Sequence, residues 1–186
     1  IRRPPRSTLC RSSAASDVYK RQFFTLSANV GAATITIPGS SVSFEVPDEF
    51  TPLSKDEIDK KWLRARPPSF AVGNERRTTT IAYDVRNQSV PEDQLEAGLQ
   101  VFERLFDRLI AGIVWKKKEI AVIGGRRWIY LEMTSNAIDT DIYNILLCTP
   151  YEGKLVLFNF NSTKEDFPKY EESLRKSLGT VSVTQK

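Results

Sequence analysis

The sequence contains no histidine, which removes the commonest side chain for proton transfer near neutral pH. Ser-His and Cys-His activation of a nucleophile are therefore excluded, and the most frequent zinc ligand is missing. Cysteine is almost absent as well, with only Cys10 and Cys148 in the chain, so no cysteine-based metal cluster is expected. No apolar run approaches the roughly 20 residues that a membrane-spanning helix requires, so we expect no transmembrane span.

The first 22 residues, IRRPPRSTLCRSSAASDVYKRQ, do not read as natural protein. The segment DVYKRQ can be encoded by GAT GTG TAT AAG AGA CAG, which resembles the transposase end used in short-read sequencing libraries. The preceding SSAAS fits the primer segment before that end, and IRRPPRST fits a flow-cell adapter read in frame. We therefore interpret residues 1–22 as a translated adapter, expect them to be disordered, and leave them out of the fold.

This exclusion changes the charge balance of the chain. The whole sequence has 27 Lys and Arg against 23 Asp and Glu, a net charge of +4. Six of the basic residues and one of the acidic residues lie in the adapter segment, so the remainder has 21 basic and 22 acidic residues. A nearly neutral body lacks the basic excess of nucleic-acid-binding proteins, and we expect no nucleic acid partner.

The next residues, 23–33, are FFTLSANVGAA, a short apolar piece that leads to Val30-Gly31-Ala32. Small or β-branched residues at the last and third-last positions suit signal-peptide cleavage after Ala32. We interpret the segment as the remnant of a signal peptide, with a flexible leader or a fraying strand as the alternative. A true remnant places the protein outside the cytoplasm, in the periplasm or envelope; otherwise the protein is cytoplasmic. Residues 34–183 are expected to form a single domain.

The first half of this domain predicts short elements. TITIPGSSVSFEVP predicts two strands joined by a Pro-Gly-Ser-Ser turn. Ser54 and Glu57 have the spacing of a capping box, which predicts a helix that Pro67-Pro68 ends. TTTIAYDVRN is rich in β-branched residues and predicts a further strand.

The clearest helical pattern is SVPEDQLEAGLQVFERLFDRLIAG, with Ser89 as a cap and Pro91 in the first turn. Charged residues cover one side of this helix and apolar residues the other, which indicates that it lies on a sheet. The apolar residues at helical spacing are Leu95, Leu99, Phe102, Phe106, Leu109 and Ile110.

Four strands follow, paired as hairpins by Gly124-Gly125 and by the turn PYEG. These strands are apolar on both faces, so both faces should be covered. A last helix is predicted from Asp166 to Gly179. The order ββ-α-β-α-ββββ-α predicts an α/β (α+β) fold, a mainly antiparallel central sheet in an α/β/α sandwich.

This arrangement resembles the PsbP/Mog/DcrB-like superfamily over nearly all of residues 35–181. The motifs that carry the resemblance are VSFEVPDEFTPLS, IGGRRWIYLEM, GKLVLFNFN and the final SLGTVSV. They are structural signatures and include no catalytic fingerprint. The superfamily includes extrinsic photosystem proteins, a Ran-binding group, bacterial envelope lipoproteins and chaperones of secreted toxins. Most of its members act by binding proteins, so the resemblance implies a binding function.

No motif in the sequence predicts catalysis, a cofactor or a metal. IGGRR lacks the spacing of a dinucleotide-binding loop, and IPGSS lacks the lysine of a phosphate-binding loop. Asp139 and Asp141 are two residues apart, as in a calcium-binding loop, but the glycine and the distal glutamate of such a loop do not follow. Cys148 lies in the apolar run ILLCT and is expected to be a buried thiol.

Two groups of residues are candidates for binding a partner. Lys116, Lys117 and Lys118 precede a predicted hairpin turn and Arg126 and Arg127 follow it, so the five could converge on an acidic partner. The alternative is a solvated strand end. Two tryptophans near them, Trp115 and Trp128, are either interface anchors or core residues.

The leading hypothesis is a non-enzymatic, exported accessory protein of the bacterial envelope that binds another protein as a monomer or weak dimer. One alternative is a cytoplasmic chaperone or immunity protein for a secreted toxin, which needs an exposed apolar groove. The other is a carrier of a small ligand or lipid, which needs a deep apolar pocket.

Overall fold

The computed structural model describes residues 33–63, 66–88, 90–136 and 140–184. The adapter segment, the cleavage position after Ala32, the predicted cap Ser89 and the residue Asp139 lie outside these ranges. Ala33, the last residue assigned to the signal-peptide remnant, is the first residue of a strand.

The strands are β1 (Ala33–Thr36), β2 (Val42–Val46), β3 (Thr51–Pro52), β4 (Phe70–Gly73), β5 (Thr79–Arg86), β6 (Val114–Ile123), β7 (Arg126–Asn136), β8 (Asp141–Tyr151), β9 (Lys154–Thr163) and β10 (Ser182–Val183). The helices are α1 (Lys55–Lys61), α2 (Leu95–Leu109) and α3 (Phe167–Gly179), and a 3₁₀ turn η1 (Glu92–Gln94) leads into α2.

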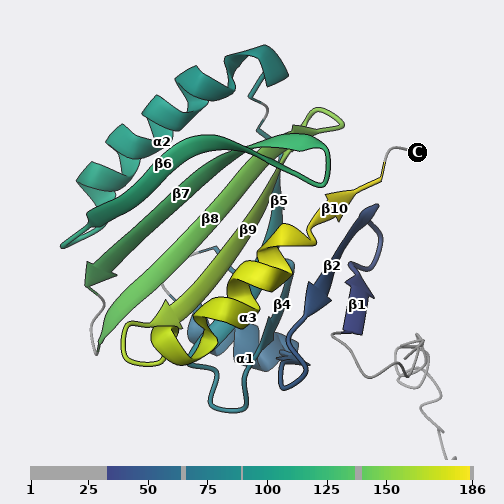
Figure 1. Ribbon diagram of the computed structural model, residues 1–186, viewed down its shortest axis with the longest axis vertical. Coiled ribbons are helices and arrows are strands. Elements are labelled where there is room, and N and C mark those ends of the chain that lie inside the picture. Colours follow the sequence, from purple (N-terminus) through teal and green to yellow (C-terminus); the bar gives the residue numbers. More distant parts are fainter. Residues whose placement is uncertain (1–32, 64–65, 89, 137–139, 185–186) are drawn as a thin grey trace, which may run out of the picture.

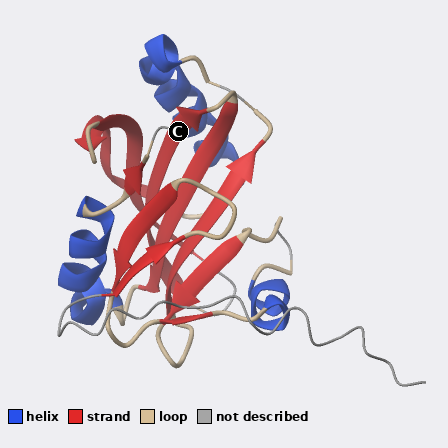
Figure 2. Ribbon diagram, turned by 90° about the vertical axis from the view of Figure 1, so that its right-hand side faces the viewer, coloured by secondary structure: helices blue, strands red, loops and turns tan. Residues whose placement is uncertain are grey.

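Seven strands form one central antiparallel sheet in the order β3-β4-β5-β9-β8-β7-β6. A second, three-stranded sheet, β1-β2-β10, lies beside α3, and helices lie on both sides of the strands (Figures 1 and 2). The prediction of an α+β fold with a mainly antiparallel central sheet between helical layers is therefore confirmed.

The predicted order ββ-α-β-α-ββββ-α lacks three strands that the structure contains. β3 and β10 have two residues each, which is too short for an alternating pattern. β4 has four residues, and two consecutive ones, Ala71 and Val72, are both fully buried, so it does not alternate either. The predicted first two strands pair with β10 in the small sheet and not with the central sheet.

The larger core lies between the central sheet, α3 and the small sheet. Phe158 of β9 is its centre, with ring contacts to Phe44 of β2 at 5.4 Å, Tyr83 at 5.3 Å and Trp128 at 6.2 Å between centroids. Leu174 of α3 is 1% exposed in the same core. Each such side chain contributes about 1.5–3 kcal/mol when it is removed from water, so this side holds most of the stability.

The opposite face of the sheet packs against α2. Leu95 of α2 is completely buried with Ile129 and Leu131 of β7. A Cβ on Gly98 would lie 3.2 Å from Ile129 Cδ1 and 3.0 Å from Val90 Cγ1, so glycine permits the close approach of helix and sheet. Leu109 does not belong to this contact: it was predicted on the sheet-facing side, but it is the last residue of the helix and is 71% exposed.

The predicted Gly124-Gly125 turn joins β6 to β7, and both residues have positive φ, 57° and 75°. Two-residue hairpin turns with positive φ at both residues favour glycine. A Cβ on Gly124 would also lie 2.5 Å from the carbonyl oxygen of Val181. The tip of the hairpin therefore rests on the chain just before β10.

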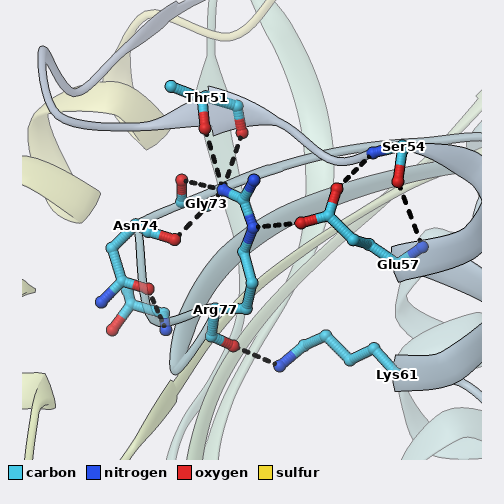
Figure 3. A network of polar contacts seen from close by, with 8 residues as sticks. Thr51, Ser54, Glu57, Lys61, Gly73, Asn74 and Arg77 are labelled. Atoms are coloured by element: carbon cyan, nitrogen blue, oxygen red, sulfur yellow. Dashed lines mark hydrogen bonds and ion pairs between the residues drawn. The ribbon is translucent and has the colours of Figure 1, made fainter.

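The short helix α1 is held by polar contacts as well as by apolar ones (Figure 3). The predicted capping box is present: Glu57 N donates to Ser54 Oγ at 3.3 Å, and Ser54 N donates to Glu57 Oε2 at 2.7 Å. These contacts, together with Arg77, lower the pKa of Glu57 from 4.5 to about 2. A seven-residue helix is too short to be stable alone, so its end contacts matter.

Arg77 joins α1 to the β4–β5 hairpin and to β3. Its Nε donates to Glu57 Oε1 at 2.9 Å, and its Nη1 donates to Thr51 Oγ1 and Gly73 O, both at 2.9 Å. Arg77 has φ 57°, an unfavourable backbone for a residue with a side chain. The guanidinium contacts offset that local cost.

We expect Arg77→Ala to lower the free energy of unfolding by about 2 kcal/mol, because several hydrogen bonds to a charged group are lost. Urea unfolding followed by circular dichroism measures the change. Arg76→Ala is the matched control: Arg76 is exposed on the same turn, so its removal should change stability by less than about 0.5 kcal/mol. Equal effects of the two variants would contradict the role given to Arg77.

Candidate functional site

The middle of the central sheet is fully covered on the α3 face and only partly covered on the α2 face, where Cys148 and Leu155 are buried but their neighbours are not. On the face that α2 contacts, α1 packs over Ala71 and Ala82 of β4 and β5, and α2 packs over β6 and β7. The strands between them, β9 and β8, carry five half-buried side chains on this face: Asn144, Leu146, Leu157, Asn159 and Asn161. We call these five residues the open strip. Central strands are normally the best-covered part of a sheet, so the open strip needs an explanation.

The strand register places the open strip in rows across the sheet. Leu146 lies opposite Asn159, and Asn144 lies opposite Asn161. Asn161 Nδ2 donates to Asn144 Oδ1 at 2.8 Å, so these two amides are joined. The strip thus has a mixed floor, with two leucines and three amides.

Three buried polar atoms without a hydrogen-bond partner lie in or beside the open strip. They are Asn159 Oδ1 in the strip, and Thr80 Oγ1 and Asp84 Oδ2 on the adjacent strand β5, on the same face. Asp84 Oδ2 lies 2.8 Å from Arg86 Nε, but this ion pair is not aligned as a hydrogen bond. Unpaired buried polar atoms are rare because each costs about 1–3 kcal/mol. All three atoms are closed off from the surface, so they belong to the interior beneath the open strip.

One wall of the open strip is the side of α2 that faces away from β6. Glu103 and Glu96 of α2 form ion pairs with Lys118 of β6 and Arg127 of β7, which fixes the opposite side of the helix. Val101 and Leu105 both lie about 160° around the helix from Glu103, at 3.6 residues per turn. They are 54% and 39% exposed, so the side of α2 toward the open strip is apolar and uncovered.

A second polar cluster lies on the other face of the sheet, where α3 meets β7 and β8. Glu132 is 4% exposed. Its carboxylate accepts hydrogen bonds from Arg175 Nη2 at 2.6 Å, from Tyr130 Oη at 2.7 Å and from Tyr143 Oη. Tyr143 in turn stacks on Phe167 with centroids 3.5 Å apart. The cluster fastens both ends of α3 to the sheet.

The electrostatics of this cluster favour a fixed charge pair over proton transfer. Burial acts to raise the pKa of Glu132, but the hydrogen bonds from Arg175, Tyr143 and Tyr130 outweigh it and leave that pKa lowered. Burial and the hydrogen bond to Glu132 raise the pKa of Tyr130 and of Tyr143. None of the three groups titrates near neutral pH, so the cluster is suited to holding α3 and not to acid–base chemistry.

The predicted partner-binding lysines lie in the middle of β6, an edge strand of the central sheet. Lys117 points to the α3 face, where it pairs with Glu119 at 2.8 Å. Lys118 points to the α2 face and pairs with Glu103. Lys116 is exposed, and the register shift of β6 lies at this residue, between Trp115 and Lys117. The three charges are therefore divided between two faces and largely neutralised.

The predicted arginines lie at the far end of the same hairpin. Arg126 donates to Pro150 O at 3.0 Å, and Arg127 pairs with Glu96. Arg126 lies opposite Ile123, five residues along β6 from Lys118, or about 17 Å at strand spacing. The structure therefore does not bring the lysines and the arginines together.

The two predicted tryptophan anchors have different environments. Trp128 is fully buried and its Nε1 donates to Ile123 O at 3.1 Å, so it belongs to the core. Trp115 is half-buried, stacks on Phe106 of α2 at 6.4 Å and donates to Asp107 Oδ1 at 2.8 Å. Trp128 therefore has no face for a partner, whereas Trp115 is partly exposed beside α2.

Sequence reasoning missed the open strip, although a signal was present. In LFNFN, Asn159 and Asn161 alternate with Phe158 and Phe160 on a strand that was predicted to be covered on both faces. Amides at every second position of a covered strand indicate that one face is left open or holds polar groups.

Metal binding and membrane insertion find no support in the described ranges. Within residues 33–63, 66–88, 90–136 and 140–184, no group of Cys, Asp and Glu side chains is placed to hold a metal ion. No helix in the same residues is long and apolar enough to cross a bilayer. Cys148 is 2% exposed, and burial raises the pKa of its thiol to about 12.

Solved structures share this fold at low sequence identity. Cyanobacterial PsbP (CyanoP) from Synechocystis sp. PCC 6803 matches 85% of this chain and 96% of its own, with 11% identity and a TM-score of 0.57. LpqN of Mycobacterium tuberculosis, described as involved in cell envelope biogenesis, matches 83% of this chain and 91% of its own, with 13% identity and a TM-score of 0.57. The PsbP-like part of the predicted resemblance is thus confirmed as a fold.

A protein from Bacteroides thetaiotaomicron matches 84% of this chain and 49% of its own, with 14% identity and a TM-score of 0.50. No family model matches the sequence, and no curated protein matches it either. Identities of this size show a common architecture and carry no residue-level function.

We expect Arg175→Met to raise the pKa of Glu132, because burial then acts with fewer opposing hydrogen bonds. A carboxyl group whose pKa is lowered in the folded state stabilises the fold at pH values above its unfolded pKa of about 4.5. This stabilisation is lost as the pH falls through the folded pKa. The variant should therefore begin to unfold at a higher pH than the parent protein when acid is added. Carbon-detected NMR titration of Glu132 and acid unfolding measure the two effects.

Glu171→Gln is the control for this variant, because Glu171 pairs with Arg175 at 2.9 Å while both side chains are substantially exposed. Its effect on stability should stay below about 0.5 kcal/mol. An unchanged acid-unfolding midpoint in Arg175→Met would show that Arg175 does not set the charge state of Glu132.

Proposed function

We propose that this protein is a non-enzymatic, exported accessory protein of the bacterial envelope that binds another protein through the open strip. The observation that carries the proposal is the half-buried floor of β8 and β9, with Val101 and Leu105 uncovered beside it. A binding surface needs such apolar area together with a few polar groups.

The chemistry of the chain supports a binding function over catalysis. The sequence has no histidine, and the thiol of Cys148 is buried with a raised pKa. The described charge cluster around Glu132 is locked in ion pairs and hydrogen bonds. The proposal also includes a single domain at residues 34–183. It keeps the predicted lysines and Trp115 of β6 and the predicted arginines of β7 as a secondary contact surface.

Export is supported by two observations. FFTLSANVGA has the character of the end of a signal peptide, and one protein with the same fold, LpqN, is described as involved in cell envelope biogenesis.

The cytoplasmic chaperone or immunity protein would use the same apolar surface but would lack a signal peptide. Two cavities lined by described residues, about 240 Å³ beside α3 and about 110 Å³ beside Tyr83 and Tyr151, are smaller than the roughly 300–1,000 Å³ of ligand pockets, so neither is the deep pocket that a carrier needs.

We expect the natural DNA upstream of Phe23 to encode a start methionine, a basic segment and an apolar stretch that continues into FFTLSANVGA. A fusion of that complete gene to alkaline phosphatase, which is active only after export, should then be active. An inactive fusion whose protein accumulates in the cytoplasm would favour the chaperone or immunity protein instead.

Site-specific photo-crosslinking tests the binding surface. A photoreactive phenylalanine at Leu146 or at Asn144 should crosslink the same protein in the native cell. Lys154, exposed at the end of the β8–β9 hairpin, is the control position and should give no such product. Identical products from Lys154, or none from either strip position, would refute binding through the open strip.

A further inference from the structure

The separation of α1 and α2 across the sheet matches the width of one α-helix over the partly covered part of β8 and β9. α1 lies over β4 and β5, and α2 lies over β6 and β7, so their axes are separated by about four strand positions. At a strand spacing of about 4.8 Å this is about 19 Å. Packed helices lie about 8–10 Å apart, so one further helix between α1 and α2 would complete the layer.

The wall on the α2 side carries an apolar stripe suited to a helix. Val101, Leu105 and Leu109 follow one another at intervals of four residues and are 54%, 39% and 71% exposed. The stripe runs about 12 Å along α2, or two turns. Exposed apolar residues are normally scattered, and three in line beside a half-buried sheet mark a contact surface.

The polar side chains of the open strip favour a peptide over an acyl chain as the occupant. Leu146 and Leu157 are apolar, but Asn144, Asn159 and Asn161 would lose water under a hydrocarbon chain without any replacement. Burying an amide without a hydrogen bond is strongly unfavourable in proteins. A helix can carry amide or hydroxyl side chains beside its apolar face, which replace the water that the exposed parts of these amides lose.

The rim adds a preference for negative charge. Arg104 and Arg108 lie about 60° and 20° around α2 from Val101, on the outer side of the stripe. Both are exposed, and neither forms an ion pair with any residue in the described part of the chain. An occupant with acidic side chains beside its apolar face would pair with them.

An extended peptide finds no comparable place on the central sheet. Such a peptide adds to a free sheet edge, and the long edge strand β6 carries Lys116, Lys117 and Lys118 and a register shift at Lys116. Charged side chains and bulges are devices that block edge pairing.

From these observations we infer that the occupant of the open strip is an amphipathic, acidic α-helix of the partner protein, lying between α1 and α2 with its apolar face on Leu146, Leu157 and the α2 stripe. This inference rests on the proposed function and specifies its partner. The binding mode is a helix laid in a groove, with anchors at intervals of three and four residues.

The test uses fluorescent synthetic peptides of about 18 residues, or five helical turns. One peptide has a leucine face flanked by glutamate, the second has lysine in place of each glutamate, and the third is the scrambled acidic sequence. We expect the acidic amphipathic peptide to bind the protein most tightly in fluorescence anisotropy. Leu105→Asp should weaken this binding by roughly tenfold or more, as for an interface anchor.

The variant Arg104→Glu/Arg108→Glu should reverse the preference toward the lysine peptide. Val122→Asp is the matched control, because Val122 is 71% exposed on β6, away from the open strip, and should leave binding unchanged. All substitutions are at exposed positions, and circular dichroism checks that each variant folds.

If the scrambled peptide binds as tightly as the acidic amphipathic peptide, or if Leu105→Asp does not weaken binding, the inference of a helical occupant is wrong. Binding to vesicles of phosphatidylglycerol and phosphatidylethanolamine that Leu105→Asp abolishes, without binding of any peptide, would overturn it in favour of a lipid surface. Photo-crosslinking at Leu146 reports binding whatever the shape of the partner. A strip-specific crosslink to a segment that is not helical would therefore refute the helix and leave the proposed function standing.

Discussion

Burial of both faces of one antiparallel sheet is the constraint on which the rest of the structure depends. Successive side chains on β5, β9, β8 and β7 point to opposite faces, so each strand needs cover on two sides. On one side Phe158 and its aromatic neighbours are enclosed by α3 and by the small sheet. On the other side α2 buries Cys148 of β8 and Leu155 of β9 as well as β7, while the rest of these two central strands stays half covered.

Ionic contacts complement apolar burial where helices meet the sheet. α3 buries a row of apolar residues but is also fixed by Arg175 to the buried Glu132. α1 buries little besides Ile58, and Arg77 joins its first turn to two neighbouring strands. The glutamate lies inside the fold in the first case and at the surface in the second, so the two contacts differ in how strongly solvent screens them.

Local signals predicted the local elements well. The Ser54–Glu57 capping box and the Gly124-Gly125 turn depend on a few consecutive residues, and both are confirmed. The two-residue strands could not be predicted, because pairing with distant strands, and not their own sequence, creates them. The open strip depends on where two helices stop across the sheet, and no window of sequence contains that distance. The ion pairs of Lys118 and Arg127 could not be predicted either, because their carboxylate partners lie on α2, well separated in sequence.

The burial of Cys148 has a consequence for where such a fold can reside. Its thiol lies against the α2 side of β8, out of contact with water, and it is the one cysteine in the described part of the chain. Thiol–disulfide exchange requires an accessible thiolate, so oxidants and glutathione do not reach this sulfur in the folded state. In the folded domain this thiol accordingly keeps one covalent form in reducing and oxidising compartments alike.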